Sequence, residues 1–493
     1  MIVEQPCDIF PAMTQRTTVP PPAASSVPEP QFDRRLGLGS AIAVVVGSIV
    51  GSGIFLTPQN VAAAVEVPGV MIFVWIATGL LTLAGALTNA EIASEITDAG
   101  GQYAFFRVLY GDLLAFLFGW TTFVVYQTGS IAAIAVGFAR YVGYFIPLPH
   151  LSAELEAWKL PIIGNIAPFS DIGLKAVAII AIIVVTVVNY VGVRFGNLMQ
   201  NAFTMMKMLA IAAIVLLGFA LGSGSVEHFF PLWGTPSTRD LLSAVGVAMV
   251  ATLWAYDGWN SLTFMAAEVR HPERTVPRAL ILGTIAVILI YVVTNLAYLY
   301  VLPIAEVAAS KLVAADMMDR VFPGYGGPLI SLAVIISTFG TLAASCMTTA
   351  RVTYAMSHDR LFFKGLAKVH PRHRTPTSAL IAQAVWSAIL VFSGTFDQLF
   401  TYVIFAGWIF YALGAAAVFI LRRKRPDANR KFRVPGYPYV PLAFVVVATW
   451  FMVNTVVTNP ADSMVGLLLV VVGIPFYLYW RRQVRPAPGN AAG

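Results

Sequence analysis

Gly47-Ser48-Ile49-Val50-Gly51-Ser52-Gly53-Ile54-Phe55 lies inside an apolar segment long enough to cross a lipid bilayer. Each of its glycines weakens a helix by about 1 kcal/mol relative to alanine. An interruption of the helix here would free backbone N–H groups that suit a carboxylate. On composition alone close helix packing is favoured, because small residues are also typical of helix contacts in membranes.

The composition of the whole chain is that of a membrane protein. Of the 493 residues, 58% are hydrophobic and 11% are charged, and the mean hydropathy is +0.77. Soluble domains are about 45–50% apolar and about 25% charged. This difference excludes a soluble enzyme, a disordered hub and a nucleic-acid-binding module. The two cysteines, Cys7 and Cys346, cannot form a disulfide framework.

About twelve segments approach the roughly 20 apolar residues that a transmembrane helix needs. The sequence therefore predicts an all-α polytopic membrane protein embedded in the lipid bilayer. We expect one membrane domain over 36–480, a disordered tail at 1–35, a short tail at 481–493, and an amphipathic stretch at 101–110 before the third span. The predicted spans are 37–61, 67–91, 112–146, 173–193, 197–222, 240–265, 277–302, 327–357, 377–395, 398–421, 439–458 and 462–480.

Positive charges cluster on one side of these spans. An even number of spans places both termini on one side, and an excess of lysine and arginine in short loops marks that side as cytoplasmic. With no signal peptide, the simplest location is a plasma membrane, and a bacterial inner membrane is favoured. The clusters are at Arg34-Arg35, 270–278, 360–374, 422–433 and 481–482, whereas the opposite loops carry scattered positives such as Lys159, Arg239, Lys311 and Arg320.

A second unusual stretch, Leu253-Trp254-Ala255-Tyr256-Asp257-Gly258-Trp259-Asn260, lies in the sixth predicted span. Asp257 precedes Glu268, at the cytoplasmic end, by roughly 16 Å of helix, which places its carboxyl near the bilayer midplane. An ionisable residue at that depth is costly and indicates a functional site. A hydrogen-bonded structural aspartate is the alternative.

Two further features lie inside the spans. Lys207 is roughly 15 Å from the start of the fifth span, too deep for its side chain to reach water. This depth favours a structural or coupling role over a misplaced span boundary. The eighth span carries Ser337-Thr338-Phe339-Gly340-Thr341 and Ala343-Ala344-Ser345-Cys346. This stripe of small and hydroxyl residues could line a cavity, although ordinary helix packing is favoured.

No catalytic or metal-binding pattern accompanies these features. All six histidines lie in loops or at span ends, and the sequence has no His-Glu-x-x-His, Gly-x-Ser-x-Gly or Walker motif. We therefore predict neither an enzyme nor a metal or cofactor site, and no nucleic-acid partner.

The two unusual stretches lie five spans apart, so their helices run in opposite directions. This arrangement is typical of inverted-repeat transporters, whose substrate binds where two interrupted helices meet at the midplane. A zwitterion would place its carboxylate at freed N–H groups around Ser52 and Gly53, and its ammonium at freed carbonyls around Trp254 and Ala255. The membrane domain would thus be a single transporter domain.

Both stretches resemble family signatures. The first resembles the span-1 signature of the amino acid–polyamine–organocation superfamily, and the second, continued through 268–278, resembles the L-type amino acid transporter branch. The resemblance covers roughly 36–480 and implies a LeuT-like 5+5 inverted repeat with helices 1 and 6 broken. Further matches are Asp98-Ala99-Gly100-Gly101, Phe203-Thr204-Met205-Met206-Lys207, Phe339-Gly340 and Arg351.

The resemblance implies a role for each matching residue. The backbone that would hold the substrate carboxylate belongs to Ile49, Gly51, Ser52 and Gly53. The carbonyls that would bind the α-ammonium belong to Trp254, Ala255 and Asp257. Trp254 would also close over the ligand as a gate. Lys207 would stand in for the second sodium ion of sodium-coupled relatives, which implies sodium independence.

Three departures from the family pattern bear on the substrate and the partner. Many relatives have a small residue at the position of Asp257, so this carboxylate could recognise a cationic side chain, pair with Lys207 or bind the substrate ammonium. The loop at about 147–172 has no cysteine, so no disulfide-linked heavy chain is expected. Animal relatives carry two consecutive acidic residues after the sixth span, whereas this chain has Ala267-Glu268 there.

The sequence therefore predicts a sodium-independent exchanger of neutral and, if Asp257 recognises them, cationic L-amino acids by alternating access. The alternative is a proton-coupled amino-acid symporter in which Lys207 loses its proton during the cycle. A nutrient sensor is less favoured, because the chain carries no appended signalling domain.

Overall fold

The computed structural model describes residue 34 and residues 36–484, apart from 98–99, 161–166, 192, 223, 238–239, 371–374, 394–395 and 427–429. In this part of the chain every regular element is a helix, and the β contact is an isolated bridge between Leu36 and Val269. Most of the two predicted tails lies outside the described residues.

Every predicted span coincides with helical structure. Ten helical stretches of the described chain are long and apolar enough to cross a membrane, and three of them run through more than one of the elements bounded below. The sixth and ninth spans contain shorter apolar helices, α11 and α17. The prediction of an all-α, multi-pass membrane protein is confirmed. The bounds are α1 (Leu38–Ile49), α2 (Gly53–Leu56), α3 (Pro58–Val65), α4 (Pro68–Glu95), α5 (Gln102–Leu109), α6 (Asp112–Thr121), η1 (Thr122–Tyr126), α7 (Gln127–Val142), α8 (Ala153–Glu156), α9 (Ile172–Val191), α10 (Val193–Leu221), η2 (Val226–Phe229), α11 (Leu241–Ala255), α12 (Ser261–Phe264), η3 (Ala266–Glu268), α13 (Pro272–Val301), α14 (Ile304–Ala309), α15 (Val313–Val321), α16 (Gly326–His358), η4 (Lys364–Ala367), α17 (Thr377–Ser393), α18 (Phe396–Lys424), α19 (Tyr439–Thr458), α20 (Pro460–Val471) and α21 (Gly473–Val484).

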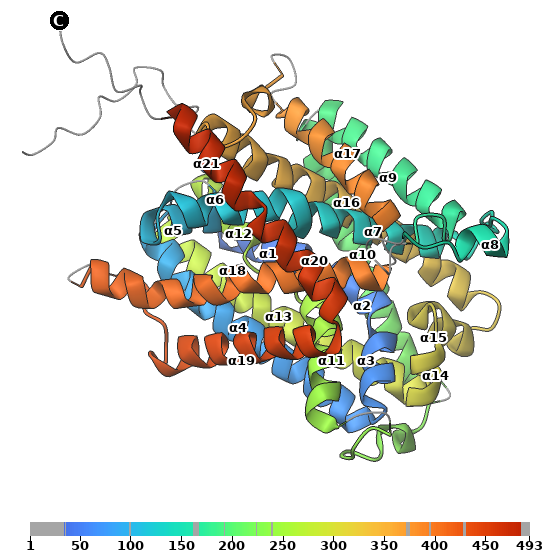
Figure 1. The fold of residues 1–493 in the computed structure, drawn as a ribbon. Helices are drawn as coiled ribbons and strands as arrows, with labels where there is room; N and C mark the ends of the chain where they lie inside the picture. The colour runs from blue at the N-terminus through green and yellow to red at the C-terminus, as the bar shows by residue number, and fades with distance from the viewer. Residues whose placement is uncertain are drawn as a thin grey trace, which may run out of the picture. The chain divides into compact units, whose positions relative to one another are not determined.

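The helices that carry the two unusual stretches pack against helices from several other spans. α13 packs along both α1 and α4, α11 contacts α3 and α4, and α16 packs against α7 and α10. α18 lies beside α19 and is crossed by α20 (Figure 1). Large apolar side chains on one face of α9 are exposed, as expected of a surface that contacts lipid; they include Ile180, Ile183, Val184 and Val187.

Part of the basic cluster at 422–433 also has a structural role. Glu91 on α4 is fully buried, and its two carboxylate oxygens accept hydrogen bonds from Arg422 on α18, each 2.8 Å long. The Val434 amide donates to the same carboxylate at 2.7 Å. This buried charge pair therefore joins α4 to α18 and to the segment that follows it.

The first and sixth spans are interrupted, as the family resemblance implies. α1 ends at Ile49, Val50 is extended (φ −71°, ψ 94°), and the helix resumes at Gly53. α11 ends at Ala255, residues 256–260 form turns, and α12 begins at Ser261. The third span contains a π-helical turn, η1, which ends at Tyr126.

Candidate functional site

The two interruptions contact one another directly. A Cβ atom built on Gly53 would lie 2.5 Å from the Cα atom of Ala255. A Cβ built on Gly258 would lie 2.8 Å from the carbonyl oxygen of Ser48, and Gly258 has a φ of +94° that favours glycine. The glycines therefore allow one backbone to approach the other at two points, which a side chain at either position would prevent.

The interruption of α1 frees three carbonyls at its end. In a continuous helix the carbonyls of residues 47, 48 and 49 would accept hydrogen bonds from the amides of residues 51, 52 and 53. Here the Gly47 carbonyl accepts a bond from the ammonium of Lys207, at 2.5 Å. Lys207 is 3% exposed on α10, so its ammonium is enclosed by the protein. A cation at this position also complements the negative end of α1.

Tyr291 on α13 joins the two interruptions. Its hydroxyl lies 3.0 Å from the carbonyl oxygen of Ile49 and 2.9 Å from that of Ala255. The sequence analysis missed Tyr291. The available signal was a tyrosine in the middle of an apolar span, with a second tyrosine, Tyr298, seven residues later. The Tyr298 hydroxyl donates to the Ile54 carbonyl at 3.3 Å.

Backbone amides remain available on the other side of the first interruption. The first backbone hydrogen bond of α2 runs from the Phe55 amide to the Ser52 carbonyl, at 3.1 Å. The amides of Ser52, Gly53 and Ile54 precede this bond and have no partner within the helix. The sequence predicts the amides of Ser52 and Gly53 for carboxylate binding, and the structure adds that of Ile54.

A cavity of about 90 Å³ opens between the two interruptions, and we refer to it as the central cavity. Six of the seven predicted substrate-binding residues line it, and Ala255 lies directly behind Gly53. Part of the small-residue stripe of the eighth span also faces it, so the interpretation of that stripe as packing alone is wrong. The lining residues are Val44, Gly47, Ser48, Ile49, Gly51, Ser52, Gly53, Gln127, Ser130, Ile134, Trp254, Asp257, Gly258, Ser261, Met265, Thr341, Ala344, Ser345 and Thr348.

The rest of the eighth-span stripe packs against neighbouring helices. A Cβ on Gly340 would lie 2.4 Å from the Cβ of Phe203 on α10, and the Cys346 carbonyl accepts a hydrogen bond from Gln383 on α17. One face of α16 therefore lines the central cavity, and another face packs against α10 and α17.

Asp257 forms a closed group with two tyrosines. The Tyr126 hydroxyl lies 2.8 and 2.9 Å from its two oxygens, which share one hydroxyl hydrogen, and the Tyr411 hydroxyl lies 2.8 Å from Oδ1. The two hydroxyls are 2.5 Å apart. These residues come from the π-helical turn of the third span, the sixth span and α18. Because Lys207 bonds to Gly47, the structure does not bring Lys207 and Asp257 together as a hydrogen-bonded pair.

This group continues into a polar chain. Asn260 accepts a weak contact from the Tyr411 hydroxyl at 3.5 Å and donates to Gln102 at 3.1 Å, and Gln102 donates to the Phe410 carbonyl at 3.1 Å. Sequence reasoning missed these partners because each lies in a different span. The π-helical turn that presents Tyr126 is a feature often found at functional sites.

Trp254 lies at the wall of the central cavity. Its side chain is 7% exposed and packs at a tilt against Phe400 of α18, with ring centroids 6.2 Å apart. Its position suits the predicted gate, because a rotation of the indole would change how the cavity is closed.

Comparisons with known proteins give consistent results. A family model described as amino acid permease matches residues 36–475. The b(0,+)-type amino acid transporter 1 of Mus musculus is 32% identical over 449 residues, which cover 90% of this chain and 88% of that protein. The serine/threonine exchanger SteT of Bacillus subtilis is 32% identical, with 91% and 97% covered. The human cystine/glutamate transporter is 28% identical, with 94% and 89% covered. These relatives are transporters, not enzymes.

Proposed function

Because the chain belongs to the amino acid permease family, we propose that it is a sodium-independent exchanger of small neutral L-amino acids, which bind in the central cavity. The observation that carries this proposal is the direct contact of two interrupted helices around one cavity. Backbone groups of opposite polarity face a single small space there, and a zwitterion has the matching charges.

The substrate carboxylate would bind the amides of Ser52, Gly53 and Ile54, which precede the first hydrogen bond of α2. The substrate ammonium would bind the carbonyl end of α11, where the partial charge is negative. Tyr291 holds the carbonyls of Ile49 and Ala255 in place, so the two halves of the site keep a fixed spacing.

The dimensions and lining of the central cavity favour small substrates. A volume of about 90 Å³ is small beside the roughly 300–1,000 Å³ typical of sites for drug-sized ligands. Hydroxyl-bearing residues of α16 and α12 line it, among them Thr341, Ser345 and Ser261. The relative named a serine/threonine exchanger supports the same substrate class.

Neutral substrates are favoured over cationic ones by the state of Asp257. Its two oxygens already share the hydroxyl hydrogen of Tyr126, and Oδ1 also contacts the Tyr411 hydroxyl. An arginine or lysine substrate would have to displace these bonds before its side chain could pair with the carboxylate. We therefore assign Asp257 a role in holding the third, sixth and tenth spans together around the site.

Several further features belong to the same proposal. Lys207 would take the place of a coupling cation, since its ammonium occupies a freed carbonyl. The membrane domain would contain twelve spans in a 5+5 inverted repeat, in a bacterial inner membrane with both termini cytoplasmic. It would work without a disulfide-linked heavy chain, because the loop at 147–172 has no cysteine.

A second candidate function is proton-coupled symport, which the tyrosine–aspartate group favours. Three contacts join the Asp257 carboxyl, the Tyr126 hydroxyl and the Tyr411 hydroxyl. Two hydroxyls supply only two hydrogens, so a proton on Asp257 would complete the third hydrogen bond. Asp257, rather than Lys207, would then carry the coupling proton.

The experiment is uptake of labelled alanine, serine, leucine and arginine by purified protein in liposomes. Vesicles would be empty, loaded with amino acid, or given a pH gradient. If the protein is an exchanger, uptake should occur only into loaded vesicles, and alanine and serine should be taken up faster than leucine and arginine. Proton-driven uptake into empty vesicles that Asp257→Asn removes would support the symporter instead, and uptake of none of the four would contradict both.

A further inference from the structure

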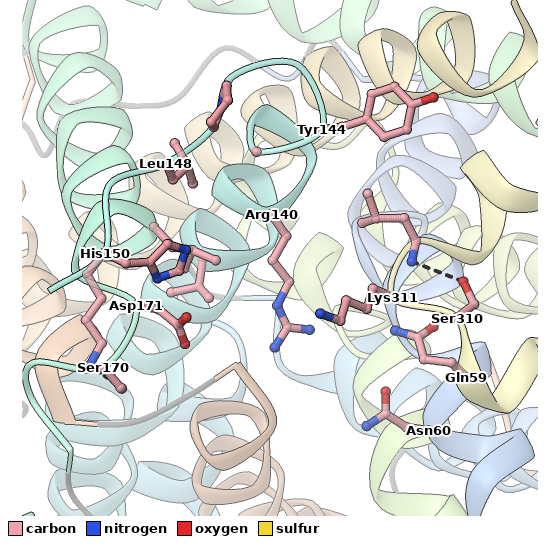
Figure 2. A pocket seen from close by; sticks show the side chains of 16 residues that line it. Gln59, Asn60, Arg140, Tyr144, Leu148, His150, Ser170, Asp171, Ser310 and Lys311 are labelled. Atoms are coloured by element: carbon pink, nitrogen blue, oxygen red, sulfur yellow. Dashed lines mark hydrogen bonds between the residues drawn. The ribbon is translucent and has the colours of Figure 1, made fainter. Parts of the chain in front are cut away.

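A second cavity lies beyond the central one along the first span, and we refer to it as the larger cavity. It has a volume of about 790 Å³. Its walls come from α3, the end of α7 with the segment after it, the start of α9, and the connection between α14 and α15 (Figure 2). The two cavities share no described lining residue.

Only a thin part of the protein separates the two cavities. On α7, Ile134 lines the central cavity and Val136 lines the larger one, roughly 3 Å further along the helix. In the first span, Gly53 lines the central cavity and Gln59 lines the larger one. Residues 54–57 lie between these two positions and are fully buried. We refer to residues 54–57 as the barrier.

Burial differs between the two ends of the central cavity. Toward the start of the first span, Val44, Ser48 and Met265 line the cavity and are half-buried. Toward the larger cavity, every residue of the barrier is 0% exposed. The structure is therefore closed on the side of the larger cavity, and a substrate could pass from one cavity to the other only if the barrier moved away from α7.

A hydrogen bond fastens the barrier to α7. The hydroxyl of Tyr141 on α7 is fully buried and donates to the Phe55 carbonyl at 3.1 Å. The neighbouring Ile54 carbonyl accepts a bond from Tyr298 of α13 at 3.3 Å. α13 packs along α1, which belongs to the same span as the barrier, whereas α7 packs against α9, α16 and α17. The Tyr141 bond therefore joins the first span to a different group of helices, and the Tyr298 bond does not.

We propose that the barrier opens during transport to connect the two cavities, and that the Tyr141 hydroxyl holds it closed. The inference rests on the proposed function, which supplies the substrate that passes. The Phe55 carbonyl has this donor only while the barrier touches α7. Once the barrier moves into the larger cavity, water replaces the tyrosine, so the bond stabilises the closed state alone.

The test measures how fast a thiol reagent reaches the central cavity from the side of the larger cavity. Ser130→Cys places a reporter in the central cavity. It would be made in a Cys7→Ser background, because the other native cysteine, Cys346, is fully buried. Sealed membrane vesicles of each orientation would be treated with a membrane-impermeant thiosulfonate, and a tag at the N-terminus would report which face is outside.

Tyr141→Phe should speed the labelling of the reporter from the side of the larger cavity by about two- to tenfold, the effect expected of one buried hydrogen bond. Tyr298→Phe is the matched control. It also removes one tyrosine hydroxyl from a barrier carbonyl, and it should leave the labelling rate unchanged. Both variants keep the aromatic ring, so the packing of the helices is preserved.

A second reporter shows whether the barrier itself has changed. Leu148 lies in the wall of the larger cavity. Leu148→Cys should therefore react equally fast with and without Tyr141→Phe, because the reagent reaches it without crossing the barrier. Faster labelling of Leu148→Cys by the same factor would place the change at the entrance instead and would overturn the inference.

Transport gives a readout that a general loss of stability would not produce. A larger population of the open state should lower the alanine concentration needed for half-maximal uptake from the side of the larger cavity. A merely damaged protein would transport more slowly without this gain. Tyr298→Phe should leave the concentration unchanged.

Equal labelling of Ser130→Cys in Tyr141→Phe and in the parent overturns the inference, and so does an equal increase in both phenylalanine variants. Faster labelling from the opposite side alone overturns it too. Normal exchange in liposomes with unchanged labelling removes the role of the barrier and leaves the proposed function intact. The expected labelling in a protein that transports none of the four amino acids supports the barrier and contradicts the proposed function.

Discussion

The two interrupted helices reach the same cavity by different chemistry. The first interruption is rich in glycine, and its freed groups are backbone atoms whose partners come from α10 and α13. The second contains a single glycine, Gly258, and brings side chains to the cavity, namely Trp254 and Asp257. The first thus offers contacts that every amino acid can use, and the second adds groups that distinguish one amino acid from another.

This difference predicts how substitutions should act. A change at the first interruption should weaken the binding of every substrate by the same factor, because all amino acids share the α-carboxylate. A change at the second should alter the order of preference among substrates, or the dependence on a proton gradient. Tyr291, which bonds to both, should affect the assembly of the site.

The largest effect is expected for Gly53→Val. Any Cβ at this position would lie 2.5 Å from the Cα of Ala255, and a β-branched side chain would also fill the place of the carboxylate. Binding of labelled alanine and serine to the purified protein should fall below detection for both. Gly39→Val is the control, since a Cβ on Gly39 of α1 meets nothing within 4 Å. Wild-type affinity in Gly53→Val would show that the first interruption does not bind substrate.

Lys207→Ala should lower exchange by about tenfold to a hundredfold for all substrates, because it removes a charged hydrogen bond to the freed Gly47 carbonyl. Lys207→Met keeps the apolar stem and should behave in the same way. Lys424→Met is the matched control, since its ammonium also bonds one carbonyl, that of Leu109, far from the interruptions in sequence. A normal exchange rate in both Lys207 variants would contradict the role of the lysine.

Tyr291→Phe should reduce stability by about 1–3 kcal/mol, the usual cost of leaving buried carbonyls without their donor. Thermal unfolding followed by circular dichroism would measure the change, and alanine should restore part of the lost stability by holding the two interruptions together. Tyr298→Phe removes one bond, of 3.3 Å, to a single carbonyl and should have the smaller effect. The opposite order would mean that Tyr291 does not join the two halves.

Trp254→Leu should have the smallest effect, a few-fold change in transport that differs between alanine and leucine. The indole packs against Phe400 at the cavity wall, so a smaller side chain should admit the larger substrate more readily. Competition of unlabelled alanine and leucine for labelled alanine uptake would measure the preference. An equal loss for both amino acids would place Trp254 among the general contacts rather than the selective ones.

The sequence predicts the spans well because they depend on local composition, whereas the first interruption was expected only through the family resemblance. Apolar segments define the helices, and the glycines at 47, 51 and 53 are close enough to interrupt one. Lys207 was also identifiable, since a charge at that depth has no local explanation. The second interruption was harder to predict: Gly258 is its single glycine, yet residues 256–260 all leave the helix.

The partners of these residues could not be predicted, because they come from distant parts of the chain. Tyr126 and Tyr411 reach Asp257 from spans far away in sequence, and nothing local distinguishes them from other tyrosines of an apolar helix. The larger cavity, lined by Arg140, Asp171 and Lys311 among others, is assembled from short connections whose packing no periodic pattern encodes. Local sequence thus located the interruptions, and tertiary structure supplied the residues that stabilise them.

The central claim is that one interruption binds the carboxylate of the substrate and the other binds its ammonium. The most direct test measures inhibition of labelled alanine binding by alanine, by alaninamide, which lacks the carboxylate, and by propionate, which lacks the ammonium. Both analogues should inhibit at least about a hundredfold more weakly than alanine, since each leaves the groups of one interruption without a partner. Inhibition by either analogue as strong as that by alanine would contradict the claim.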